Sequence, residues 1–156
     1  MKLLRFASSP SRLVQGRTLA FGLAIGALFA SGCSDSDPNR LPVVPVKGQL
    51  TFNGQPAAGA FVVFHPKAGA DSRVVPARAI VGKDGSFDVS TYDAGDGATP
   101  GEYNLTVEWR KLVQTGKDYA AGPNVLPPKY SKPTTSKLEV RIADSGGPLD
   151  PINLKR

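Results

Sequence analysis

The two rarest reactive side chains in this 156-residue sequence are a single cysteine, Cys33, and a single histidine, His65. A lone cysteine cannot form a disulfide within the chain, and protein zinc sites need three or four Cys, His or acidic ligands. A serine-type catalytic triad would have to use His65, yet the sequence contains no G-x-S-x-G nucleophile motif. We therefore expect His65, which precedes Pro66 at the end of an apolar stretch, to be a surface histidine at a strand end.

Two acidic pairs could contribute oxygen ligands to calcium. Asp84 and Asp88 alternate with Ser86 like the start of a calcium loop, but no glutamate follows at the spacing that such loops require. Asp93 and Asp96 lie in the glycine-rich stretch "YDAGDGATPG", where aspartate favours turns. The turn interpretation is favoured at both places, a weak calcium site stays open as the alternative, and no cofactor is expected.

The surroundings of Cys33 suggest a different chemistry for its thiol. Residues 1–32 contain four basic residues and no acidic one, and residues 18–30, "TLAFGLAIGALFA", form an apolar run. The run is shorter than the about 20 residues of a membrane-spanning helix, and the whole pattern is typical of a bacterial secretory signal peptide. The following "ASGC" resembles a lipobox, with Ala30 where leucine is usual. This resemblance predicts that Cys33 becomes the lipid-modified, palmitate-bearing N-terminus of the mature protein.

A lipidated Cys33 would hold the protein on a membrane, since each buried methylene contributes about 0.8 kcal/mol. We expect three parts: a signal peptide over residues 1–32, the lipidated cysteine and a flexible tether over residues 33–43, and one domain over residues 44–156. The tether is polar and contains proline. Some bacteria retain lipoproteins in the inner membrane through an aspartate after the cysteine. Ser34 occupies that position here, which favours the outer membrane.

The charge of the chain changes once the signal peptide is set aside. The whole chain has a net charge of +6, but four of the positive charges lie in residues 1–32, which leaves 15 basic and 13 acidic residues. This near balance removes the main reason to expect binding to nucleic acid. The remaining charges are spaced singly along the sequence, which predicts an ordinary solvated surface.

Short apolar stretches separated by Gly, Pro, Asn and Asp predict an all-β domain. Alternation of period two in residues 44–52 and 103–109 places apolar side chains on one face of each strand. Asn53-Gly54 marks a tight turn, and the apolar "AFVVFHP" that follows should be a strand that is central or covered on both sides. "ARAIVGKDGSFDVST" predicts a hairpin that turns at Asp84-Gly85. With "SKLEVRI" and "DPINLK", we expect a single antiparallel β-sandwich of about seven strands.

The alternation also predicts which side chains form the core. The expected core consists of Val46, Leu50, Phe64, Phe87, Tyr103, Leu105, Val107, Leu138 and Val140. Ile80 and Val89 are further candidates from the predicted hairpin.

Three segments together resemble a known family: "VKGQLTFNGQPAAGAFVVFHP", "VGKDGSFDVST" and "TPGEYNLTVEW". Their order is similar to that of the carboxypeptidase-regulatory-like, transthyretin-like, sandwich found in small bacterial lipoproteins. The resemblance implies a non-catalytic binding or structural module outside the cytoplasm, with an envelope protein or glycan as its unidentified partner and no small-molecule substrate. The alternative is an envelope hydrolase or a carbohydrate-binding accessory domain with an unrecognised site.

Residues 110–136 show no clear strand or helix period, and they exceed the roughly 12–15 residues usual for a structureless loop. We expect the first half, up to Pro123, to be mobile and the proline-rich second half to dock on the sandwich through Val125, Leu126 and Tyr130. Tyr119 should then be exposed. Tyr119 and Lys117 are the candidate contacts to a partner, the alternative being that this half is only a tolerated insertion.

Overall fold

A computed structural model of the chain describes residues 37–156, and the predicted signal peptide and Cys33 lie outside the described residues. The elements follow in this order: β1 (Val46–Phe52), β2 (Gln55–Pro56), β3 (Phe61–Pro66), β4 (Ala77–Ile80), β5 (Ser86–Asp88), β6 (Gly101–Glu108), β7 (Arg110–Thr115), β8 (Asp118–Asn124), the 3₁₀ helix η1 (Pro128–Ser131), α1 (Pro133–Ser136), β9 (Glu139–Ile142), β10 (Gly147–Pro148) and β11 (Ile152–Leu154). None of the helices among these residues is long and apolar enough to cross a membrane.

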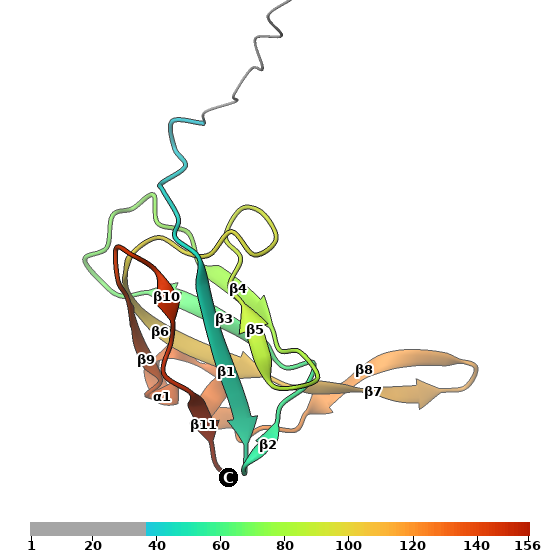
Figure 1. Cartoon of the computed structure of the whole chain (residues 1–156). Coiled ribbons are helices and arrows are strands. Elements are labelled where there is room, and N and C mark those ends of the chain that lie inside the picture. The colour runs from blue at the N-terminus through green and yellow to red at the C-terminus, as the bar shows by residue number, and fades with distance from the viewer. Residues whose placement is uncertain (1–36) are drawn as a thin grey trace, which may run out of the picture. The chain divides into compact units, whose positions relative to one another are not determined.

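The strands form two sheets that face each other, together with a separate hairpin (Figure 1). One sheet is built around β1, which pairs with β2 and β5 along one edge and with β10 and β11 along the other. The second sheet has the strand order β4-β3-β6-β9. The predicted all-β sandwich is confirmed, and β3 is a central strand as expected. The pairings of β1 with β10 and β11 are parallel, because the C-terminal segment runs along β1 in the same direction.

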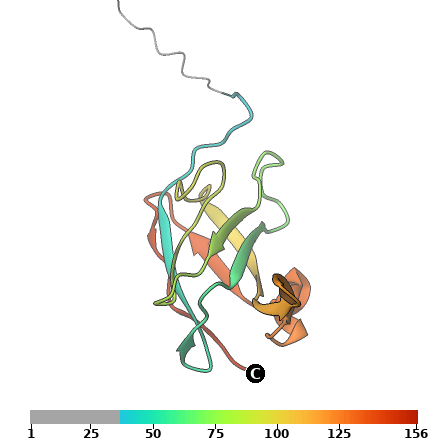
Figure 2. The same ribbon diagram turned by 90° about the vertical axis from the view of Figure 1, so that its right-hand side faces the viewer.

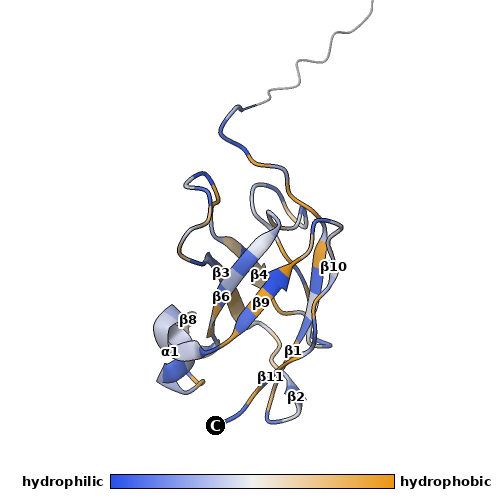
Figure 3. Cartoon of the chain, turned by 90° about the vertical axis from the view of Figure 1, so that its left-hand side faces the viewer, coloured by the Kyte–Doolittle hydropathy of each residue, from blue (hydrophilic) through white to orange (hydrophobic). Residues whose placement is uncertain are grey.

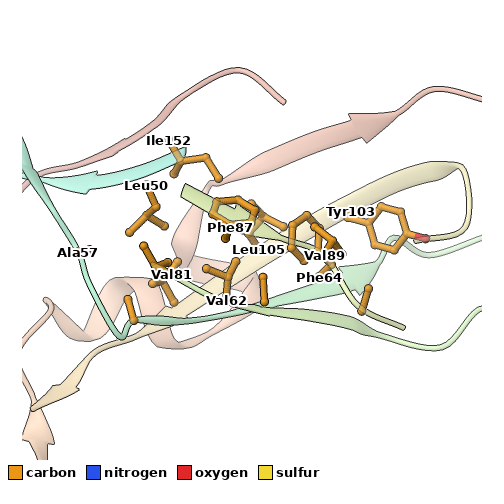
Figure 4. Close-up of a cluster of buried hydrophobic side chains, with 14 of the residues drawn as sticks. Leu50, Ala57, Val62, Phe64, Val81, Phe87, Val89, Tyr103, Leu105 and Ile152 are labelled. Atoms are coloured by element: carbon orange, nitrogen blue, oxygen red, sulfur yellow. The ribbon is translucent and has the colours of Figure 1, made fainter. Parts of the chain in front are cut away.

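The core lies between the two sheets, where inward-facing side chains of both interdigitate (Figure 4). Phe64 of β3 packs edge-on against Phe87 of β5 and against Tyr103 of β6, which joins the two sheets through aromatic contacts. Phe87 lies directly opposite Gly48, where a Cβ atom would come within 2.2 Å of its ring. The glycine therefore leaves the space that the aromatic ring fills.

Seven of the nine predicted core residues are fully buried, and Leu138 and Val140 are half-buried against the core because β9 is an edge strand. The prediction for Ile80 is wrong: its side chain is 69% exposed. Ala77 and Ala79 point inward from β4 and Val81 continues the same parity, so Ile80 faces outward. Apolar residues occupy both parities in "ARAIV", so local alternation could not decide between the two faces.

Two turn predictions have different outcomes. Asn53 and Gly54 both have positive φ angles, of 50° and 79°, as a type I′ turn between paired strands requires. The turn at Asp84-Gly85 exists, with Gly85 at φ 89°, and the predicted hairpin is confirmed only in part: Arg78 and Ser90 form an isolated antiparallel bridge, and the backbone N–H of Gly82 donates to the carbonyl oxygen of Ser86 at 2.7 Å. β4 pairs with β3 whereas β5 pairs with β1, so the chain crosses from one sheet to the other at this turn.

Residues 110–136 contain more regular structure than the sequence predicted. The first half is not a loop, since β7 and β8 form a two-stranded antiparallel hairpin that projects from the sandwich (Figures 1 and 2). The second half docks as expected: Tyr130 of η1 is 7% exposed and Leu126 is buried. Val125 does not contribute to this docking, because its side chain is largely exposed.

Candidate functional site

The β7–β8 hairpin presents two of the three most exposed large apolar side chains of the described residues, the third being Ile80. Leu112 is 72% exposed and Tyr119 is 69% exposed, and every residue of β7 is exposed. Leu112 pairs with Ala121 and Gln114 pairs with Tyr119. Because paired residues point to the same side and alternate residues share a face, Leu112, Gln114, Tyr119 and Ala121 lie on one face of the hairpin. The prediction that Tyr119 is exposed is confirmed.

The tip of the hairpin is formed by Gly116 and Lys117 between the paired residues Thr115 and Asp118. Gly116 has a φ angle of 66°, the conformation that a two-residue turn with glycine in its first position requires. Lys117 is exposed in this turn beside Tyr119 on the following strand. The Gly-Lys dipeptide between two β-forming stretches is the signal that would have predicted the hairpin from sequence.

Asn124 fixes the base of the hairpin to the sandwich. Its Oδ1 accepts hydrogen bonds from the backbone N–H groups of Trp109 (2.9 Å) and Leu126 (3.1 Å), and its Nδ2 donates to Ser131 Oγ (3.0 Å). Trp109 is held in turn, because its indole N–H donates to the carbonyl oxygen of Ala58 at 2.8 Å. The hairpin therefore leaves the sandwich from a defined base, and sequence reasoning did not identify the role of Asn124.

His65 lies near a strand end, as predicted, but its ring is only half-exposed. Its Nε2 lies 2.9 Å from Thr106 Oγ1, and partial burial lowers the pKa of the imidazole. No carboxylate of the described residues forms an ion pair or hydrogen bond with the ring. A neutral imidazole that contacts a threonine hydroxyl is a structural arrangement and does not form a catalytic triad.

The acidic pairs are engaged in turns. Asp84 Oδ1 accepts from the backbone N–H (3.0 Å) and the hydroxyl (2.7 Å) of Ser86, and these bonds lower its pKa. Asp96 accepts from the backbone N–H groups of Thr91 (2.7 Å), Tyr92 (3.0 Å) and Asp93 (3.0 Å). Burial alone would raise the pKa of Asp96, but these three donors outweigh it and the pKa is lowered.

Metal ligands do not cluster in the described part of the chain, where no three Cys, His, Asp or Glu side chains come together. Asp88, the second acid of the first pair, instead accepts a 2.7 Å hydrogen bond from Lys47. Asp93 lies 3.4 Å from Arg40. The turn interpretation therefore accounts for Asp84, Asp93 and Asp96, whereas Asp88 lies on β5 and is paired with Lys47.

An open groove of about 470 Å³ lies along the side of the sandwich between β9 and the C-terminal segment. Leu138, Val140 and Leu149 contribute apolar surface to it, and Lys137, Arg141, Glu139 and Asp150 contribute charges of both signs. Its charges are balanced and its apolar residues are packed against the core. The groove is therefore the gap between two edge strands, and the hairpin is the stronger candidate site.

Comparison with known proteins gives no family for this chain. No protein-family model matches it, and no curated protein matches it either. A DUF3823 family protein from Parabacteroides merdae is similar with 16% identity and a TM-score of 0.32, covering 74% of this chain and 46% of that protein. A provisionally assigned carbohydrate binding protein from Pseudomonas aeruginosa has 13% identity and a TM-score of 0.35, covering 74% of this chain and 91% of that protein. The chain thus spans about half the length of the first, and neither likeness assigns a ligand.

Proposed function

We propose that the protein is a lipid-anchored lipoprotein of the bacterial cell envelope whose β-sandwich is a non-catalytic binding module. The observation that carries this proposal is the β7–β8 hairpin, which exposes Leu112 and Tyr119 while the core beneath it is complete. Exposed apolar side chains that gather on one face mark interaction sites, and Leu112 and Tyr119 lie on the same face of the hairpin. The outer edges of β7 and β8 are also unpaired among the described strands, which leaves backbone donors and acceptors free for a partner.

The anchoring part of the proposal rests on the sequence. Cys33 follows a basic segment, an apolar run and small residues, and it precedes the described domain by only a few residues. Two or three acyl chains on one cysteine would hold the domain at the membrane, since stable anchoring takes two chains. Ser34 favours the outer membrane as the site of retention. A domain held in this way needs no catalytic residues to bring a partner to the membrane.

The experiment that tests the proposal is metabolic labelling with radioactive palmitate in a bacterial host. We expect the wild-type protein to incorporate the label and to partition into detergent, and Cys33→Ser to lose both properties. Ser36→Ala is the matched control, because it changes a hydroxyl residue beyond the lipobox and should leave labelling unchanged. Equal labelling of wild type and Cys33→Ser would refute lipid attachment at this residue.

A further inference from the structure

Positive charge is segregated within the described chain, which the sequence analysis did not predict. Residues 110–137 and 155–156 together hold eight basic residues and one acidic residue, Asp118. The other described residues, 37–109 and 138–154, hold seven basic and eleven acidic residues. The near-zero net charge therefore conceals an uneven distribution of charge between these two parts of the chain.

The fold brings these two basic segments together. Tyr130 Oη donates to the carbonyl oxygen of Lys155 at 2.8 Å and accepts from its backbone N–H at 3.1 Å, so the C-terminus lies against η1. The Asn124–Ser131 bond joins η1 to the base of the hairpin. We call this surface the basic pole and define it by six residues: Lys111, Lys129, Lys132, Lys137, Lys155 and Arg156. In Figure 3 the ribbon of α1 and that of the last residues before the C-terminus carry the colours of hydrophilic residues.

The cations of the basic pole lack acidic partners in the described structure. Elsewhere Lys47, Lys67 and Arg73 each form ion pairs with Asp or Glu, whereas no residue of the pole does. Two of the ammonium groups instead lie over aromatic rings, Lys111 at 4.8 Å from the ring centre of Trp109 and Lys129 at 5.0 Å from that of Tyr130. Six like charges on one surface repel each other and attract polyanions over roughly a Debye length, about 8 Å at physiological salt.

We propose that the basic pole binds an acidic polysaccharide and that Tyr119, farther out on the projecting hairpin, is a second contact for the same polymer. Five of the six pole residues are lysines, whose compact, flexible charges suit repeated anionic groups better than a single planar carboxylate. The uncovered ring of Tyr119 offers a flat apolar face on which a sugar ring can stack, and Gln114 beside it offers amide donors and an acceptor. The proposal rests on the proposed function in one respect, since a location outside the cytoplasm favours a polysaccharide over nucleic acid.

Two other occupants fit the surface less well. A second copy would bring two basic poles together, and their repulsion opposes such pairing. Apolar side chains at the hairpin tip would strengthen binding to an anionic membrane, but the tip is polar (Gln114 to Asp118) and Leu112 lies farther back. The chain also enters the domain at the opposite end, where β1 begins, whereas the C-terminus lies where β1 finishes (Figures 1 and 2).

The length of the tether also argues against a membrane as the ligand of the basic pole. Residues 33–43 reach at most about 36–40 Å when fully extended. The seven residues of β1 already span about 23 Å of that distance. To place the basic pole on the membrane that holds Cys33, the tether would have to run back along the whole strand, with a large loss of conformational entropy. A polymer layer beyond the membrane is within reach without that loss.

The test uses the protein purified from a whole-cell extract in a non-ionic detergent, which recovers it whether or not it is lipidated, with alginate, a polyuronate, as the immobilised probe and neutral dextran as its reference. We expect salt-dependent binding to alginate and none to dextran. The triple variant Lys129→Gln, Lys132→Gln, Lys155→Gln should bind at least about tenfold more weakly and show a flatter dependence of affinity on salt. The matched control, Arg78→Gln, Lys83→Gln, Arg141→Gln, removes the same charge from cations that form no ion pair in the described structure. It should change affinity less than about twofold.

Further arms identify the class of partner. Tyr119→Ala should weaken binding to alginate but not to polyglutamate, which carries carboxylates without sugar rings. Equal weakening by the two triple variants, or no binding to alginate, would overturn the proposal. The proposal would also be overturned if Tyr119→Ala bound alginate as tightly as the wild type and the wild type bound polyglutamate as tightly as alginate. That result would point to an acidic protein as the partner. Displacement of the protein from the immobilised alginate by detergent micelles that contain phosphatidylglycerol, but not by soluble alginate, would point to a membrane. Because lipidation plays no part in the measurement, these failures are distinct from failure of palmitate labelling.

Discussion

Replacing Leu105 by alanine tests the packing that holds the two sheets together. Leu105 lies on β6, pairs with Phe64 on the central strand β3, and has no exposed surface. Its backbone N–H also bonds to the carbonyl oxygen of Leu138 at 2.8 Å, which holds the strand in register with β9. The side chain cannot relax toward solvent, so its truncation leaves a cavity between the sheets.

The expected loss follows from the atoms removed. Three carbon atoms leave the core, and at about 0.8 kcal/mol for each buried methylene the transfer contribution is about 2.4 kcal/mol. The unfilled cavity adds to this, and buried Leu→Ala changes cost about 2–5 kcal/mol in total. We expect about 3–4 kcal/mol here, against a total stability of about 5–15 kcal/mol for a typical domain. The variant should therefore still fold, with a clearly lower stability.

Urea unfolding followed by the fluorescence of Trp109, the only tryptophan, provides the assay. With a slope of about 1–3 kcal/mol per molar urea, the midpoint should fall by roughly 1–4 M with the slope unchanged. Leu112→Ala is the matched control, because the same truncation at a 72% exposed side chain should change stability by less than about 0.5 kcal/mol. Equal losses in the two variants, or a loss of a few tenths of a kcal/mol for Leu105→Ala, would refute the assigned face of β6.

Two further predictions concern the Asp96 turn and the hairpin. Asp96→Ala removes the acceptor of three backbone N–H groups and should cost about 1.5–3 kcal/mol at neutral pH by urea unfolding. Because folding lowers the pKa of Asp96, its contribution is present above the unfolded pKa of about 3.9 and is lost as the pH falls through the folded value. The difference between variant and wild type should therefore shrink at low pH, and a difference independent of pH would contradict this account. In limited trypsin digestion, cleavage at the exposed Lys117 should precede cleavage at Lys129, which adjoins the buried Tyr130; early cleavage at Lys129 would show that η1 is not docked.

Local features of the sequence were sufficient to predict the fold class and most of the core. Alternation of period two identified the inward faces of β1 and β6, because neighbouring side chains of a strand must point to opposite sides. Asn53 and Gly54 predicted their turn, since both adopt positive φ angles at little cost. The exposure of Tyr119 and the burial of Tyr130 also followed from the residues around them.

Two features depended on the tertiary structure: which strands pair, and which face points inward in a strand with apolar residues at both parities. The sequence shows a turn at Asp84-Gly85, but whether the flanking strands pair with each other or with β1 and β3 depends on contacts distant in the chain. Ile80 illustrates the same limit, because apolar residues occur at both parities of "ARAIV" and the packing between the sheets buries Ala77, Ala79 and Val81 instead.

The candidate site shows most clearly which features the sequence predicts and which only the folded chain determines. Its residue types are visible in the sequence, and Tyr119 and Lys117 were predicted as contacts from exposure and charge. The basic pole was not, because Lys155 and Arg156 are far from residues 110–137 along the chain and approach them only through the hydrogen bonds of Tyr130. Sequence spacing describes charge in one dimension, whereas the electrostatic field depends on distances in space, and only the folded chain determines those distances.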